Sequence, residues 1–191
     1  MQPILQVEDD PNDVFLLQHA MNKAGVANPI QVATDGQQAI DYLKGAGKFA
    51  DRERFPLPCL VLLDLKLPYV MGLDVLEWIR QQPGLSLIVI LLTASAEDAD
   101  IATAYRLGAN AFLTKPTTAG ELEDMAKAIK DFWLTHNTLP QESDAKPAAS
   151  WADKSTTALG THGQARAHDN VRCETIATRR EKWSNTVQEK K

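Results

Sequence analysis

The chain has 191 residues, of which 44% are hydrophobic, and this is enough to build one core of ordinary domain size. Its net charge of −5 is unevenly spread, because residues 1–140 hold 11 Lys and Arg against 18 Asp and Glu, whereas residues 141–191 hold 9 against 7. An acidic body argues against a surface that follows nucleic-acid phosphates, and no apolar run approaches the roughly 18 residues of a membrane span, so we expect a cytoplasmic protein that binds neither.

The first predicted element is a short strand, Ile4–Val7, because an uninterrupted apolar run of this length is typical of a strand buried on both faces. The run meets Glu8 too early to be the apolar part of a signal peptide. A helix should follow, with Asp10 as its N-cap, Pro11 in its first position and Gly25 as its stop.

Further apolar runs predict four more strands, and helical spacing lies between and after them. The runs are Ile30–Ala33, Cys59–Leu63, Leu87–Leu92 and Ala111–Leu113. The helical residues are Leu73, Leu76 and Ile79 up to Pro83, then Ile101, Ala104 and Tyr105 up to Gly108, and most clearly Leu122, Met125, Ala126, Ile129, Phe132 and Trp133. Strands that alternate with helices predict an α/β fold with a parallel sheet covered on both faces.

Two segments depart from this alternation. The connection Gly45–Pro58 carries Gly, Pro and charge without periodicity, so we expect a surface loop at the end of the sheet opposite the strand carboxyl ends, with a partner contact as the alternative role. The predicted domain is residues 1–140. Residues 141–191 are rich in Ser, Thr, Ala, Gln and charge, which predicts a largely disordered tail.

Polar side chains stand at the ends of most of the predicted strands. Glu8 and Asp9 follow the first, Asp64 follows the third, Thr93 follows the fourth, and Lys115 comes shortly after the fifth. In open α/β sheets ligands bind outside the carboxyl ends of the strands. These residues are therefore expected to meet in one pocket.

The acidic residues of this pocket predict a metal ion. Glu8, Asp9 and Asp64 would repel one another unless a cation neutralised them. Oxygen ligands without His or Cys suit Mg²⁺, and Mn²⁺ could substitute. With the metal, the Lys115 ammonium and the Thr93 hydroxyl could stabilise a phosphoryl group during its transfer to an Asp carboxylate.

Four stretches together resemble the response-regulator receiver family, of the CheY-like fold, over roughly residues 2–138. They are Val7-Glu8-Asp9, Leu62 through Pro68 with Gly72, Leu92-Thr93-Ala94, and Gly108 through Pro116. The resemblance implies a doubly wound, five-stranded parallel sheet in the order 2-1-3-4-5. It also implies a two-component response regulator that is switched by phosphorylation.

The resemblance assigns the phosphoacceptor and the metal ligands. Asp64 is similar to the family's phosphoacceptor, Asp9 to a direct metal ligand, and Glu8 to a ligand that acts largely through water. The backbone carbonyl of Lys66 is similar to a further metal contact. Because that contact uses backbone, Lys66 in place of the more common Asn should still permit metal binding.

The resemblance also assigns the residues that sense the phosphoryl group. Thr93 and Lys115 are similar to the sensing pair, and Phe112 matches the aromatic switch position, where a static core residue is the alternative. The Lys115–Pro116 bond resembles the family's cis peptide.

The Glu-Asp start, the long loop before Cys59 and the ending from Phe132 to Pro140 resemble the single-domain regulators of phytochrome-type histidine kinases. The implied partner is a histidine kinase. A homodimer through the fourth helix, fifth strand and fifth helix is compatible with the amphipathic last helix. The chain would be a signalling domain rather than an enzyme, with at most autophosphorylation from small donors and autodephosphorylation.

Two other functions use the same residues differently. A haloacid-dehalogenase-like phosphatase also needs an Asp nucleophile and Mg²⁺, but it needs a second Asp two positions later, where this chain has Lys66. A transcription factor would use the basic tail, where Arg179, Arg180 and Lys182 are too sparse to indicate DNA binding.

Overall fold

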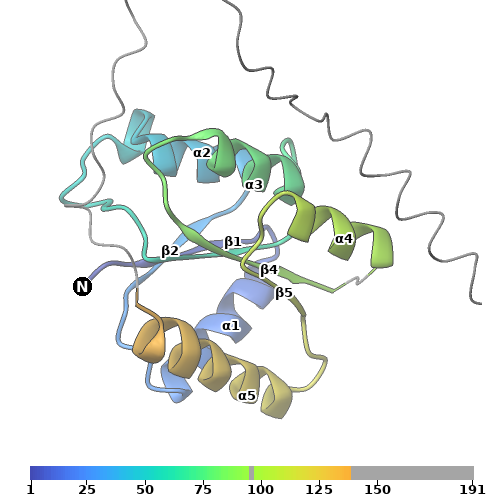
Figure 1. Ribbon diagram of the computed structural model, residues 1–191. Coiled ribbons are helices and arrows are strands. Elements are labelled where there is room, and N and C mark those ends of the chain that lie inside the picture. Colours follow the sequence, from blue (N-terminus) through green and yellow to red (C-terminus); the bar gives the residue numbers. More distant parts are fainter. Residues whose placement is uncertain (95–96, 139–191) are drawn as a thin grey trace, which may run out of the picture. The chain divides into compact units, whose positions relative to one another are not determined.

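The computed structural model describes residues 1–94 and 97–138, and within these ranges strands and helices alternate along the chain (Figure 1). The strands are β1 (Ile4–Val7), β2 (Ile30–Ala33), β3 (Leu60–Leu63), β4 (Ile88–Thr93) and β5 (Ala111–Thr114). The helices are α1 (Pro11–Lys23), α2 (Gly36–Lys44), α3 (Gly72–Gln81), α4 (Asp98–Arg106) and α5 (Ala119–Ile129), with a short 3₁₀ helix at Gly47–Phe49 and a π-helical stretch at Lys130–His136. The predicted tail, residues 141–191, lies outside the described residues.

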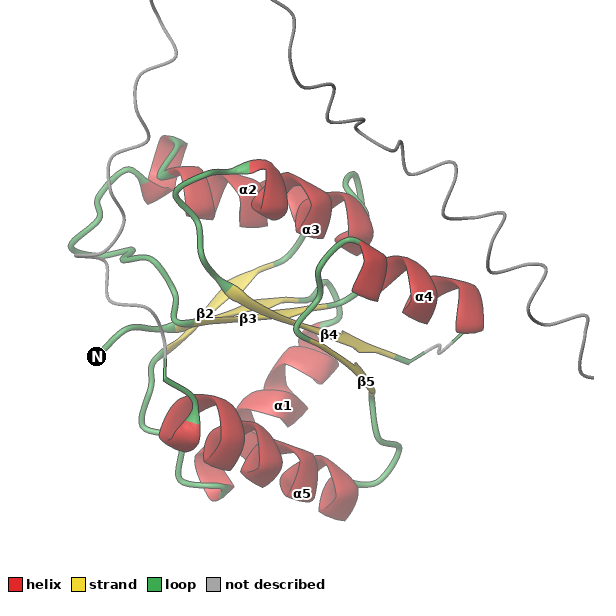
Figure 2. Ribbon diagram, in the orientation of Figure 1, coloured by secondary structure: helices red, strands yellow, loops and turns green. Residues whose placement is uncertain are grey.

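All strand pairs in the described sheet are parallel, in the order β2-β1-β3-β4-β5, which confirms the expected α/β fold class and strand order. Helices α1 and α5 cover one face, and α2, α3 and α4 cover the other (Figure 2). The chain therefore reverses its direction of winding after β2, and the edge between β1 and β3 is the switch point at which such folds bind ligands.

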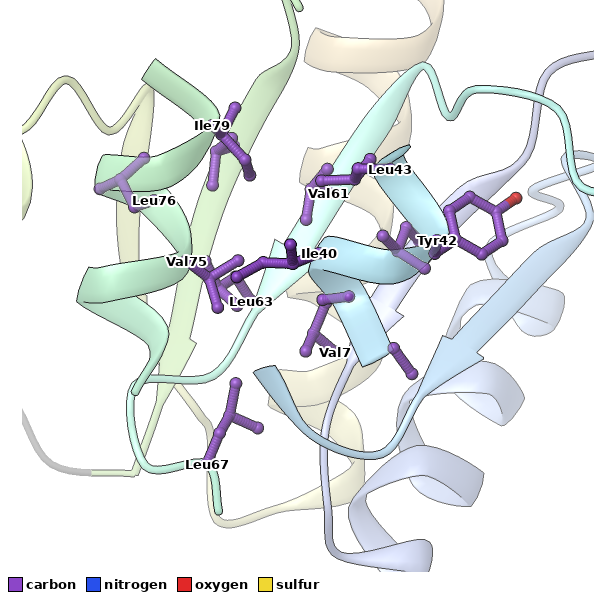
Figure 3. Packing of buried hydrophobic residues seen from close by; sticks show 14 of the residues in the cluster. Val7, Ile40, Tyr42, Leu43, Val61, Leu63, Leu67, Val75, Leu76 and Ile79 are labelled. Atoms are coloured by element: carbon purple, nitrogen blue, oxygen red, sulfur yellow. The ribbon is translucent and has the colours of Figure 1, made fainter. Parts of the chain in front are cut away.

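The strand sequences fit this sandwich because neighbouring residues point to opposite faces. Val7, Val61 and Leu63 pack against α2 and α3 in one buried cluster (Figure 3). Ile4 and Leu62 belong to a second cluster under α1 and α5. Two covered faces explain why the strands read as continuous apolar runs, and the predicted strand bounds are correct to within one residue at each end.

The start of α1 matches its prediction. The Asp10 carboxylate accepts a hydrogen bond from the Asn12 backbone N–H at 2.7 Å, Pro11 is the first helical residue, and Gly25 follows the helix with a φ of 75°. These contacts fix the chain immediately after Glu8 and Asp9, so the acidic pair is held between the end of β1 and the first turn of α1.

The burial predicted for the last helical stripe is wrong at its end. Phe132 is 57% exposed, although its spacing from Ile129 would place it on the buried face of an α-helix. The chain becomes π-helical from Lys130, so each residue turns through a smaller angle and the α-helical periodicity no longer applies. Tyr105 of α4 is likewise 53% exposed, on a helix in which Ala104 is the buried residue.

The connection between α2 and β3 lies at the end of the sheet where the strands begin, as expected (Figure 1). It packs closely against α2, because the Arg52 guanidinium donates to the backbone carbonyls of Tyr42, Leu43 and Phe55 at 2.6 to 3.1 Å. Phe49 is buried against the Tyr42 ring, with centroids 5.2 Å apart. These contacts give the connection a structural role that the sequence alone did not indicate.

Candidate functional site

Asp64 lies at the carboxyl end of β3, next to the switch point. Its backbone N–H donates to the Val7 carbonyl of β1 at 3.0 Å, and its side chain is only 9% exposed. The start of α3 lies directly on it, since a Cβ added to Gly72 would come within 2.0 Å of the Asp64 carbonyl oxygen. Glycine at position 72 is therefore required for this close approach.

Lys115 follows β5 and brings its ammonium to Asp64. Its backbone N–H donates to the Thr93 carbonyl at 2.8 Å, which fixes the turn beside the end of β4. Its Nζ atom lies 2.7 Å from Asp64 Oδ2, 2.5 Å from Glu8 Oε2 and 2.8 Å from Asp13 Oδ2. The structure thus joins the ends of β1, β3 and β5 through one cation.

These contacts and burial shift the pKa values of Lys115 and Glu8. Burial alone would lower the pKa of Lys115, but its hydrogen bonds with Asp13, Asp64 and Glu8 outweigh burial and raise that pKa above its ordinary value. Burial raises the pKa of Glu8, and the Lys115 ammonium opposes this only in part. The lysine therefore stays charged, and its ammonium favours the ionised form of the buried glutamate, against the effect of burial.

Thr93 is the last residue of β4 and is almost fully buried. In the sheet it pairs with Thr114, the residue before Lys115, so Thr93 and Lys115 are neighbours at the same edge. Phe112 of β5 is half-buried and packs on the opposite face from α1 and α5, against the cluster under α2 and α3. Its ring thus lies on the α4 side of the sheet, and its register partner in β4 is Leu91, two residues before Thr93.

The expected metal ligands are only partly brought together. Glu8 and Asp64 converge on Lys115, whereas the Asp9 residue is exposed and the Lys66 backbone meets Asp64 through its N–H, 3.2 Å from Oδ1. Within residues 1–94 and 97–138, no three His, Cys, Asp or Glu side chains are grouped as a metal site. The Glu8 and Asp64 carboxylates nevertheless form an oxygen-only donor set in contact with the Lys115 ammonium. Such a donor set fits a hard divalent ion.

The expected cis Lys115–Pro116 bond is wrong for this structure, in which every described peptide bond is trans. Trans is the ordinary preference of an X-Pro bond, by about 0.5–1 kcal/mol. The three carboxylate contacts of Lys115 are made with the bond in this form.

Asp13 is a site residue that sequence reasoning missed. It stands one helical turn after the Asp10 cap, and helical spacing alone could have placed it on the side of α1 that faces the acidic pair. It was hidden because acidic residues in the first turn of a helix are common for reasons of the helix dipole. The structure gives it a direct ion pair with Lys115.

Comparison with known proteins agrees with this fold. The model of the response regulator receiver domain matches residues 4–127. Response regulator Rcp1 of Synechocystis sp. is 37% identical over 138 residues, which cover 72% of this chain and 92% of Rcp1. The probable methanogenesis regulatory protein FilR2 of Methanothrix harundinacea is 37% identical over 141 residues, covering 72% of this chain and 86% of FilR2.

Solved structures give the same result. The Mn²⁺-bound form of Rcp1 superimposes with a TM-score of 0.67 at 35% identity, covering 74% of this chain and 100% of Rcp1. The phosphorylated cyanobacterial phytochrome response regulator RcpA gives a TM-score of 0.68 at 35% identity, covering 73% of this chain and 99% of RcpA. Among the helices that the structure describes, none combines the length and the apolar character needed to cross a membrane.

Proposed function

The chain belongs to the response regulator receiver family of two-component systems, and from this premise we propose that Asp64 accepts a phosphoryl group from a histidine kinase in a reaction that depends on Mg²⁺. The observation that carries the proposal is the contact of one partly buried ammonium, Lys115 Nζ, with the carboxylates of both Asp64 and Glu8. A positive charge beside an acidic residue at a sheet switch point is suited to receive a phosphoryl group.

The residues of the site have separate roles in this transfer. An Asp64 carboxylate oxygen forms a bond to phosphorus while the phosphorus–nitrogen bond of the donor histidine breaks, and the nitrogen keeps the electron pair. Lys115 holds negative charge on the phosphoryl oxygens, and the Thr93 hydroxyl donates to one of them. Positioning and fixed charge, rather than a general base, are what such a transfer needs.

The divalent ion would be held by Asp64, Asp9, Glu8 largely through water, and the Lys66 carbonyl, and it would neutralise the oxygens of the incoming group. Mn²⁺ should substitute, in keeping with the Mn²⁺-bound form of Rcp1. The exposed Asp9 is free of any described ion pair, so it can turn toward such an ion without losing a salt bridge.

The output that we propose is an exchange of binding partners. In the unphosphorylated structure the Lys115 ammonium is shared among three carboxylates. A phosphoryl group on Asp64 would add close to two negative charges beside it. Phe112 lies on the α4 side of the sheet, so a pull on Thr93 would alter the packing of α4 and β5. A homodimer through α4, β5 and α5 would cover Tyr105, which is half exposed on α4.

The donor that we propose is a phytochrome-type histidine kinase, since RcpA is a cyanobacterial phytochrome response regulator. The domain's own chemistry would be limited to autophosphorylation from small donors and autodephosphorylation. A phosphatase is less consistent with the site, because the position of the second acid is Lys66, whose side chain points to solvent.

Labelling with acetyl phosphate tests the proposal. The full chain should take up one base-labile phosphoryl group per molecule with Mg²⁺ and almost none with excess EDTA. Asp64→Asn should abolish the label, whereas Asp74→Asn, on the exposed side of α3, should keep it. Label that persists in Asp64→Asn would contradict the site, and repeated turnover of phosphomonoesters without an adduct would favour the phosphatase.

A further inference from the structure

Gln6 is an unusual residue in the middle of β1. Its strand neighbours Leu5 and Val7 are apolar, and alternation places Gln6 with Ile4 on the face covered by α1 and α5. The residue is 2% exposed, and within the described residues neither its Nε2 nor its Oε1 atom has a hydrogen-bond partner. Buried amides are normally paired with protein groups or ordered water, so this amide can take a partner from outside the described residues.

A cavity lies against this amide. About 60 Å³ in it is open to the centres of water-sized molecules, and one water needs roughly 10–15 Å³ by this measure. Its wall is mainly apolar, with Leu17 of α1, Leu62 of β3, Leu92 of β4 and Leu122 of α5. The space is therefore large enough for a molecule of several heavy atoms that combines a polar end with a short apolar body.

Lys115 lines the same cavity, but it offers no further donor. An ammonium has three N–H groups, and those of Lys115 are used by Glu8, Asp13 and Asp64. These three carboxylates against one ammonium leave an excess of negative charge at this end of the wall, which disfavours an anion. Gln6 is thus the polar anchor for an uncharged ligand.

We propose that Gln6 and this cavity form a binding site for a small, uncharged molecule with an amide-like head and a short aliphatic body. The Gln6 amide presents a donor and an acceptor side by side, so a primary amide can pair with it through two hydrogen bonds. The aliphatic body would pack against the leucine side chains of the wall. Glu8, Asp64 and Lys115 also line this cavity, so the ligand would lie beside the phosphoryl-transfer site. Its binding to the unphosphorylated chain does not depend on the proposed function.

An NMR titration of the full, unphosphorylated chain with propionamide tests the site, with propionate as the matched anion. Propionamide should produce saturable shifts of the Gln6 side-chain NH₂ and of the Leu17 and Leu122 methyl groups. Propionate should bind at least about tenfold more weakly, as expected when two buried hydrogen bonds and the charge balance are lost. Equal binding of both compounds, or no saturable shift with propionamide, would overturn the proposal.

Variants locate the site. Gln6→Met keeps the length of the side chain without its amide and should weaken propionamide binding at least about tenfold, whereas Gln31→Met on neighbouring β2, outside the cavity wall, should leave it unchanged. Leu122→Phe should fill the cavity while Gln6 remains, and it should therefore abolish propionamide binding. It provides a second test in case Gln6→Met fails to fold. Unchanged propionamide binding in Gln6→Met or Leu122→Phe would contradict the assignment. An NMR cross-peak from the Gln6 side-chain NH₂ to water alone, with propionamide present, would contradict it as well.

Discussion

Replacement of Lys115 by Met should destabilise the protein far more than loss of an ordinary surface lysine. The Lys115 ammonium is the shared partner of Glu8 and Asp64, whose side chains are only 6% and 9% exposed. Removing one partner of a buried ion pair costs about 3–5 kcal/mol, because the charge left behind is uncompensated. We expect about 3 kcal/mol, the lower end, since Asp13 is 39% exposed and can turn to water.

Urea unfolding at pH 7 in EDTA would measure this change. The matched control is Lys127→Met, which removes an exposed pair with Asp124 at 3.0 Å and should cost less than about 0.5 kcal/mol. Excess Mg²⁺ should restore part of the stability lost in Lys115→Met, because a bound cation would neutralise the same carboxylates. A loss below about 1 kcal/mol, or equal losses in the two variants, would refute the idea that Lys115 balances these charges.

Three further changes test other parts of the site. Burial raises the folded-state pKa of Glu8 above 4.5, so the contribution of Glu8 to stability is complete below pH 4.5 and is lost as pH rises through the folded pKa. Glu8→Gln should remove this pH dependence from the free energy of unfolding in urea measured across that window. Parallel pH curves for the variant and the original chain would contradict it. Gly72→Ala should destabilise the protein by about 3 kcal/mol and impair labelling of Asp64, because the added Cβ would lie 2.0 Å from the Asp64 carbonyl oxygen. Gly120→Ala, in open space on α5, should instead stabilise the protein by about 0.5–1 kcal/mol. Equal effects of the two substitutions on thermal unfolding would contradict this. Gln6→Met should raise the free energy of unfolding by about 1 kcal/mol, since it removes a buried unpaired amide, and a clear loss of stability would show that the amide has a partner.

The fold could be predicted from the sequence because buried parallel strands leave a local signal. Runs such as Cys59–Leu63 are apolar at every position, and the observed β3 starts only one residue later. The meeting of Asp64 with Lys115 was also predictable, since parallel strands all present their carboxyl ends at one edge. Local sequence patterns were therefore sufficient to predict the strands and the edge of the sheet at which Asp64 and Lys115 meet.

The details that failed depend on contacts between distant segments. Asp13 is an ordinary first-turn acid until the turn after β5 brings Lys115 to it, 102 residues away. Phe132 fits a helical stripe until the backbone changes to π-helical hydrogen bonding. Gln6 occupied one place in an apolar run, and only the packing of α1 and α5 shows that its amide is buried without a protein partner among the described residues.

Chemical identification of the phosphorylated residue tests the role of Asp64 most directly. The full chain, labelled by acetyl phosphate with Mg²⁺, can be reduced with borohydride, which converts an aspartyl phosphate to homoserine, and then mapped by peptide mass spectrometry. Homoserine is expected at position 64 and at no other position. Homoserine at Asp9 or Asp13, or a phosphoryl group that resists reduction and maps to Thr93, would contradict the claim that Asp64 is the phosphoacceptor.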